Sequence, residues 1–220
     1  MKKLILMFAA MVLLAAPVMA DPMPPVNFHY PTLSGAEYTA VATVRLGWDG
    51  VWHGGSFTVN LVNGSLLPDV APFETFCVES EITFSPGAVY YASINDVAIR
   101  GRPTVSQEAL TPEAAWIYSQ FRAGALGGYT DRQISEAIWY QQDATMPGGV
   151  NNALSVAAQA HASDGIGNVR VLNLWTLRQD GTEWVASDVQ SQLILVPAPA
   201  AIGLGVLGLA LVGWLKRRVG

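Results

Sequence analysis

The sequence predicts an α+β fold that is mainly β: an antiparallel β-sandwich or barrel with a helical insert at about 111–162, followed by a C-terminal transmembrane helix. On both sides of the insert, apolar residues alternate with a period of two, as in half-buried strands. Within the insert the period changes and helix-start signals appear. The N-terminal end is an apolar segment of the kind that directs export, and the C-terminal end is an apolar segment of the kind that enters a membrane.

The first 20 residues have the form of a secretory signal peptide. Two lysines precede a short apolar run at 4–16, and Val18 and Ala20 are small residues at the positions that signal peptidase reads. We therefore expect cleavage before Asp21 and export of the rest of the chain. A retained membrane anchor is the alternative, which the shortness of the run disfavours.

The C-terminal segment predicts a membrane helix. Residues 200–215 are apolar throughout, and Lys216, Arg217 and Arg218 follow as a basic stop signal. As a helix, the apolar run spans about 24 Å, a little less than a bilayer core. Because the N-terminus is expected to be exported, the domain should lie outside the inner membrane.

The segment between these ends is long enough for one domain, which we place at 37–196 after a proline-rich, extended lead-in at 21–36. Five of the 12 cations of the chain lie in the signal and the tail, so seven remain in residues 21–196 with all 17 acids, a net charge of −10. Such an acidic domain is a poor candidate for binding nucleic acid. Its single cysteine, Cys77, has no partner for an internal disulfide.

Four strands are expected before the insert. We place them at 37–48, 56–62, 75–81 and 88–94. Turn signals support this division, with Asn63 and Gly64 after the second strand and a Ser-Pro-Gly turn before the fourth. The side chains expected to face inward in the first two strands are Tyr38, Ala40, Ala42, Val44, Leu46, Trp48, Phe57, Val59 and Leu61.

Three helices are expected in the insert. Thr111 is a capping residue followed by Pro112, so a helix should run from there to about Arg122. Thr130 and Gln133 have the spacing of a capping box at the start of the second helix. A short third helix comes next, and strands follow it. We place these last elements at 151–162, 169–176, 183–186 and 190–196.

A short motif precedes the apolar C-terminal helix. Val196, Pro197, Ala198 and Pro199 stand immediately before that helix and its basic end. This order resembles the PEP-CTERM sorting signal of Gram-negative, exopolysaccharide-making bacteria, with Ala198 in place of the usual Glu and a tail at 197–220. The resemblance implies recognition by an exosortase-type enzyme, an inner-membrane-anchored intermediate, and delivery to the cell envelope or extracellular matrix. A plain tail anchor is the alternative.

Two further motifs lie within the domain. Residues 76–79 read Phe-Cys-Val-Glu, and residues 134–139 read Ile-Ser-Glu-Ala-Ile-Trp. They resemble the two motifs of bacterial thioester domains, an aromatic-Cys-hydrophobic-acid motif and a hydrophobic-Gln-x-Ala-Ile-Trp motif. The resemblance implies a buried thioester between a Cys thiol and a Gln side chain, an electrophile that acylates amines on a target surface and so gives covalent adhesion.

The sequence departs from that family at the acyl-donor position. Ser135 stands where the Gln belongs, and a serine side chain has no carbonyl to give. On a helix, Gln133 lies about 200° away around the axis, and Gln142 lies roughly 10 Å along it. We therefore expect a degenerate thioester domain that has kept its scaffold. Cys77 is then a buried, inert thiol close to Ser135.

No catalytic, cofactor or metal site is expected, and we expect the protein not to be an enzyme. The three histidines are far apart, and no nucleophile stands beside a base in a recognised motif. Glu79 and Glu81 share a strand face and could be read as a glycosidase pair, but two acids in an acidic domain are more simply solvated.

Several functions stay open. The interpretation that explains both ends and both motifs is a non-catalytic envelope or matrix protein that binds or adheres to exopolysaccharide or surface proteins. A carbohydrate-binding module is an alternative, because the chain has seven tryptophans, of which Trp52 is the best candidate for an exposed ring. The others are a working covalent adhesin that uses another Gln and an extracellular enzyme.

Overall fold

The computed structural model describes residues 42–48, 55–66, 72–80, 82–99, 107–143, 152–181 and 183–196. The expected signal peptide at 1–20, the lead-in at 21–36 and the tail at 197–220 lie outside these residues. Among the helices that are described, none is both long and apolar enough to cross a membrane.

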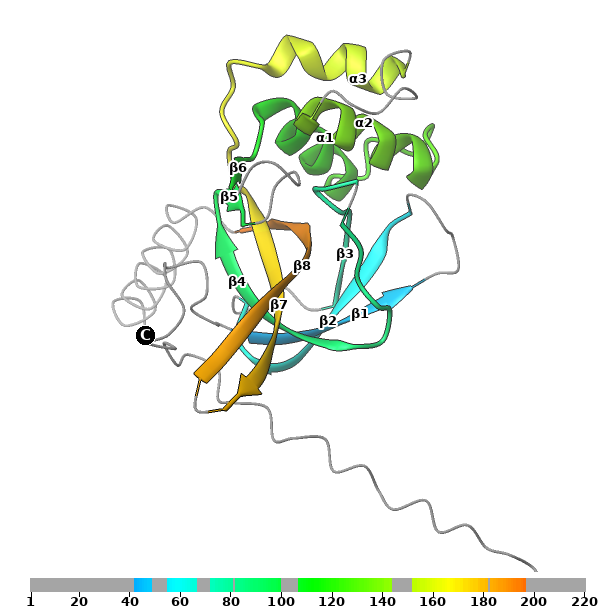
Figure 1. The fold of residues 1–220 in the computed structure, drawn as a ribbon. Coiled ribbons are helices and arrows are strands. Elements are labelled where there is room, and N and C mark those ends of the chain that lie inside the picture. The colour runs from blue at the N-terminus through cyan, green and yellow to red at the C-terminus, as the bar shows by residue number, and fades with distance from the viewer. Residues whose placement is uncertain are drawn as a thin grey trace, which may run out of the picture.

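The domain is mainly β, with one curled antiparallel sheet of six strands and three α-helices (Figure 1). The strand order is β3-β2-β1-β4-β7-β8. The strands are β1 (Ala42–Trp48), β2 (Phe57–Gly64), β3 (Phe73–Thr75), β4 (Val89–Asn95), β7 (Val169–Asp180) and β8 (Glu183–Leu195). A small second sheet, which the sequence did not predict, pairs β5 (Val97–Ala98) with β6 (Glu108–Ala109). The expected α+β class is confirmed.

The two edges of the six-stranded sheet meet just after β3. Val78 N donates to Ser191 O at 2.9 Å, and Leu193 N donates to Phe76 O at 3.0 Å. Between these two bonds, Cys77 lies opposite Gln192 in an antiparallel bridge. The chain therefore pairs with β2 up to Thr75 and with β8 immediately afterwards. We call the pairing of residues 76–79 with 190–193 the seam.

The structure corrects three of the expected strands. The strand expected at 75–81 is wrong, because β3 is short and ends at Thr75, where the chain leaves β2. The two strands expected at 183–186 and 190–196 are one strand, β8. Its irregularity is a bulge, in which two residues of β8 lie opposite Asn173 of β7.

The inward faces of β1 and β2 follow the alternation only in part. Ala42, Val44, Leu46 and Val59 are fully buried, as predicted. Leu61 was expected inside but is 39% exposed. β3 pairs only with the first three residues of β2, so Leu61 lies where β2 is an edge strand that still pairs with β1 but no longer with β3.

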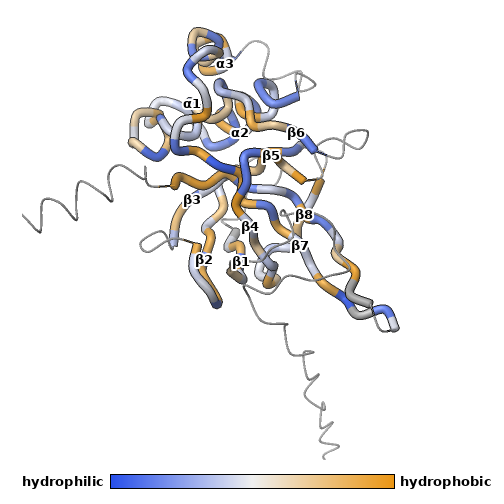
Figure 2. Tube along the Cα trace, turned by 90° about the vertical axis from the view of Figure 1, so that its left-hand side faces the viewer, coloured by the Kyte–Doolittle hydropathy of each residue, from blue (hydrophilic) through white to orange (hydrophobic). Residues whose placement is uncertain are grey.

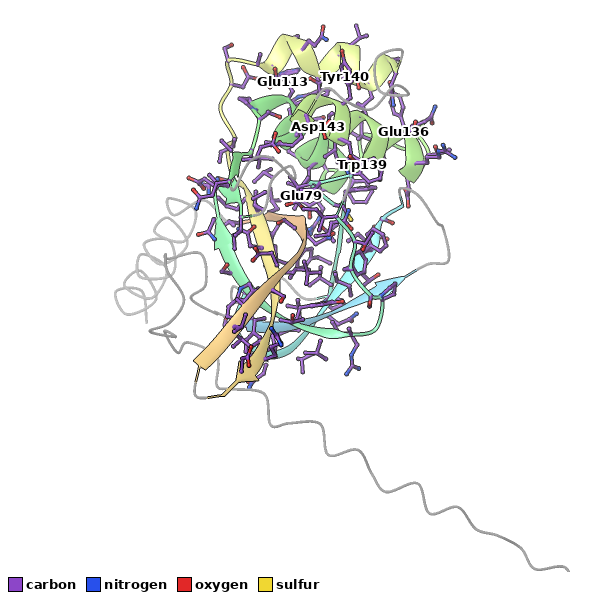
Figure 3. The ribbon with its side chains drawn as sticks, in the orientation of Figure 1. Glu79, Glu113, Glu136, Trp139, Tyr140 and Asp143 are labelled. Atoms are coloured by element: carbon purple, nitrogen blue, oxygen red, sulfur yellow. The ribbon has the colours of Figure 1, made fainter. Side chains whose placement is uncertain are left out.

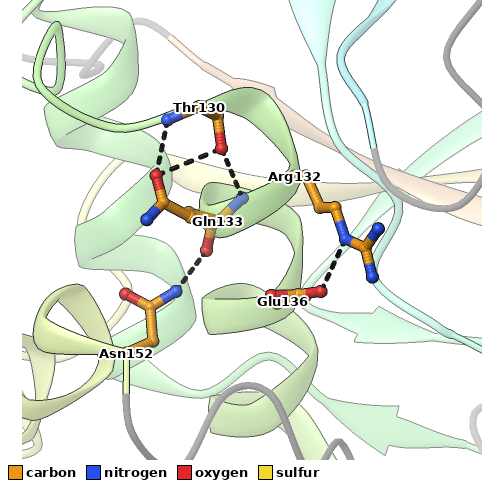
Figure 4. Close-up of polar contacts among 5 residues, drawn as sticks. All are labelled: Thr130, Arg132, Gln133, Glu136 and Asn152. Carbon is orange, nitrogen blue, oxygen red and sulfur yellow. Dashed lines mark hydrogen bonds and ion pairs between the residues drawn. The ribbon is translucent and has the colours of Figure 1, made fainter.

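The first two helices, α1 (Pro112–Arg122) and α2 (Asp131–Asp143), begin where the sequence places them. The third, expected at 151–162, is shorter: α3 (Ala153–Ala158) is followed by a 3₁₀ turn at Gln159–His161. Thr111 Oγ1 accepts from Ala114 N at 3.2 Å and caps α1. Thr130 and Gln133 form the predicted capping box, in which Thr130 N donates to Gln133 Oε1 at 2.9 Å (Figure 4).

The helices lie together over one end of the curled sheet, and two apolar cores result (Figure 1). The first core joins the helices to the seam through Phe76, Ile117, Tyr118, Ile134, Ile138 and Leu154. The second lies inside the sheet and contains Val44, Leu46, Val59, Leu172 and Leu174. Figure 2 shows apolar and hydrophilic residues following one another along the strands of the sheet. The seam therefore adjoins the helical layer.

The cap of α1 gives a stability prediction. Thr111→Ala removes the acceptor for Ala114 N and should lower the free energy of unfolding by about 1 kcal/mol, whereas Thr111→Ser keeps a hydroxyl acceptor and should cost much less. Urea denaturation followed by circular dichroism measures both variants. Equal stability of Thr111→Ala and the wild type would contradict the assignment of this cap.

Candidate functional site

Cys77 lies at the centre of the seam and is almost completely buried. Its thiol is free, and Sγ accepts a hydrogen bond from Gln192 Nε2 at 3.3 Å. Burial raises the pKa of the thiol far above its usual range, and the hydrogen bond from Gln192 offsets this only in part. Cys77 therefore carries a neutral thiol at neutral pH and is a weak nucleophile in the closed structure.

The second motif packs against the first. Ser135 and Trp139 lie one turn apart on the buried side of α2. The indole Nε1 of Trp139 donates to Cys77 O at 3.0 Å, which ties the helix to the seam across 62 residues of sequence. Ser135 is 1% exposed, and its Oγ has no hydrogen-bond partner among the described residues. The structure thus brings the two sequence motifs together.

The two glutamines considered from the sequence are both engaged elsewhere. Gln133 is exposed and serves as the capping-box partner of Thr130, as predicted. Gln142 is buried, where its Oε1 accepts from Thr111 N at 3.2 Å and its Nε2 donates to Ala109 O at 2.7 Å. Glu136, next to Ser135, faces outward and forms an ion pair with Arg132 at 2.8 Å (Figure 4). None of these three is directed at Cys77.

Gln192 is the polar neighbour of Cys77 that sequence reasoning missed. Its Nε2 also donates to Gln190 O at 3.2 Å, and its Oε1 has no partner among the described residues. Gln192 and Cys77 are 115 residues apart, and their pairing depends on the register of β8 against the chain after β3. Alternation in β8 could have marked Gln192 as inward-facing, but it could not have revealed which residue lies opposite.

Glu79 forms a second polar group at the seam. The sequence suggested a solvated acid, but Glu79 is only 5% exposed. Figure 3 shows Glu79 between the helices and the strands of the sheet. Its Oε2 accepts from Ser191 N at 2.6 Å, which satisfies a backbone N–H in the bulge of β8, and Gln190 Nε2 donates to its backbone carbonyl. Burial raises the pKa of Glu79 to about 7, although the hydrogen bonds from Ser191 oppose this shift.

The described tryptophans serve mainly as packing residues. Trp175 and Trp139 are buried, and Trp116 is half-buried with its ring stacked on His161 at a centroid distance of 4.2 Å. The described part of the chain presents no exposed coplanar pair of Trp or Tyr rings. Trp52, the expected exposed ring, lies outside the described residues.

Within the described residues, no three His, Cys, Asp or Glu side chains gather closely enough to hold a metal ion. Searches of protein-family models, of curated proteins and of solved structures gave no match to this chain. The functional argument therefore depends on the seam and on the two motifs that meet there.

The contact between α2 and the seam can be tested by mutation. Trp139→Phe leaves the buried carbonyl of Cys77 without its donor and should lower the free energy of unfolding by about 1–3 kcal/mol. Trp116→Phe, the same change on a half-buried ring of α1, is the matched control and should cost less. Urea denaturation of both variants provides the comparison. Equal losses of unfolding free energy in the two variants would show that the hydrogen bond from Trp139 adds nothing to the stability that any indole ring provides.

Proposed function

We propose that the protein is an exported, exosortase-sorted protein of the cell envelope or extracellular matrix with a non-catalytic binding or adhesion role. Its domain has the scaffold of a thioester domain without the bond. After export the C-terminal helix holds the chain in the inner membrane, and processing at the motif 196–199 precedes delivery to the surface. Exopolysaccharide and surface proteins are the partner classes that suit an acidic domain in this place.

The observation that carries the proposal is the packing of the two motifs around a position that cannot supply an acyl group. Trp139 holds α2 against Cys77. Ser135 lies on the same buried side of that helix, and its hydroxyl has no hydrogen-bond partner among the described residues. The thiol of Cys77 is neutral and buried. This arrangement supports a retained scaffold whose adhesion is noncovalent.

The intact mass of the protein tests the proposal. We expect the mass of residues 21–196 to equal that of the plain sequence, and we expect Cys77 to be alkylated once the protein is denatured. A mass lower by one ammonia, restored by adding methylamine, would contradict the proposal, because it would show an internal thioester.

A substitution at the donor position tests the scaffold itself. Ser135→Gln supplies the missing carboxamide, and we expect part of the variant to lose one ammonia in a reaction that Cys77→Ala abolishes. Ser135→Glu has nearly the same shape but does not condense with a thiol in water, so it is the matched control. If Ser135→Gln folds and keeps its full mass, position 135 is not the donor position of a thioester scaffold.

A second candidate function is supported by one contact. Gln192 Nε2 lies 3.3 Å from Cys77 Sγ, and its Oε1 has no described partner, so Gln192 is the residue best placed to replace the missing donor. Attack of Sγ on the side-chain carbonyl carbon would form the S–C bond and break the C–N bond, and Nε2 would leave as ammonia with the thiol proton. The product would be a covalent adhesin.

The mass measurement separates these two functions when Gln192→Glu is included. If the wild type is short by one ammonia and Gln192→Glu has the mass of its own plain sequence, Gln192 is the donor and the protein is a covalent adhesin. A full mass for the wild type eliminates this second candidate.

A further inference from the structure

If Glu79 were ionised, the polar contacts around its carboxylate would be one hydrogen atom short. Ser191 Oγ lies 3.1 Å from Glu79 Oε1 and 2.9 Å from Asn173 Oδ1. A serine hydroxyl has a single hydrogen to donate. If Glu79 were ionised, both of these neighbours would be acceptors, so one of the two contacts would have no hydrogen in it.

The orientation of Asn173 cannot relieve this shortage. Its Nδ2 donates to Val97 O at 2.8 Å, and its Oδ1 accepts from Ile99 N at 2.9 Å. Exchanging the two amide atoms would place an NH₂ group against the N–H of Ile99 and an oxygen against the carbonyl of Val97. Asn173 Oδ1 is therefore an acceptor, and Ser191 must donate its hydrogen to it.

A protonated Glu79 satisfies every one of these contacts. Its Oε1–H donates to Ser191 Oγ, which donates to Asn173 Oδ1, while Oε2 still accepts from Ser191 N. No Lys, Arg or His among the described residues forms an ion pair with Glu79. The charged group that acts on it is Glu108 of β6, a like charge, and the titratable neighbour on its own segment is the neutral thiol of Cys77.

We propose that the proton on Glu79 is a pH-operated latch that keeps the seam closed, and that its loss lets the seam open locally and admits water to Cys77 and Gln192. An ionised carboxylate needs hydration, and separation of residues 76–79 from 190–193 provides it. That separation breaks two backbone hydrogen bonds across the seam and leaves the pairing of β1 with β2 and β4 in place. The latch is independent of the partner that the domain binds.

The direction of the effect follows from the two states of Glu79. In the closed seam its pKa is about 7, and in the open, hydrated seam it returns toward its ordinary value of 4.5. Opening therefore becomes more favourable as the pH rises between these values, and the closed seam is most stable at acidic pH. Between pH 5.5 and 7.5 the equilibrium constant for opening should rise roughly 20-fold.

Hydrogen exchange of the full chain, purified in detergent, tests the latch. After correction for intrinsic exchange rates, the protection of the seam amides Val78 and Leu193 should fall roughly 20-fold from pH 5.5 to pH 7.5. Low urea should leave seam exchange at pH 7.5 nearly unchanged, because a local opening exposes little surface. Glu79→Gln, whose NH₂ group can donate to Ser191 Oγ, should abolish the pH effect, and Glu108→Gln should reduce it.

Three results would overturn the proposal. The first is protection of the seam that does not change with pH. The second is an equal fall in Glu79→Gln. The third is seam exchange with the same rate and urea dependence as the amides of β1 and β2, which would mean that the seam opens only when the domain unfolds. If Glu79→Gln does not fold, the wild type and Glu108→Gln still decide among these results.

Discussion

The rest of the structure depends on the pairing of residues 76–79 with 190–193. This seam joins the two edges of the six-stranded sheet, and its centre is the Cys77–Gln192 bridge. The first core lies between the seam and the helices, and the sheet curls around the second. Because Trp139 of α2 donates to the carbonyl of Cys77, the helical layer is fixed to the same point.

Three buried polar side chains gather in the seam. The thiol of Cys77, the amide of Gln192 and the carboxyl of Glu79 are all buried there. Burial disfavours the charged form of both the thiol and the carboxyl, so the closed seam is neutral at pH values below the pKa of Glu79. A buried, neutral thiol is consistent with the noncovalent binding role proposed above.

Local signals in the sequence predicted the parts of the fold that local physics determines. Thr111 and Thr130 cap their helices as expected, because a cap depends on residues only three positions apart. Long-range pairing was not predictable from the sequence. No residue near Thr75 signals that the chain leaves β2 and pairs with β8, and no residue near Cys77 identifies Gln192 as its partner. The burial of Glu79 was missed for the same reason, since its partners Ser191 and Asn173 are distant in sequence.

A carbon-13 NMR titration of the Glu79 side-chain carboxyl would test the account most directly, with Glu79→Gln used to assign the resonance. The account predicts a neutral carboxyl at pH 5.5 and a midpoint near pH 7. A carboxylate already ionised at pH 5.5, with a midpoint near the ordinary value of 4.5, would contradict it. The hydrogen count around Ser191 would then require a different network, and the seam would have no proton to lose.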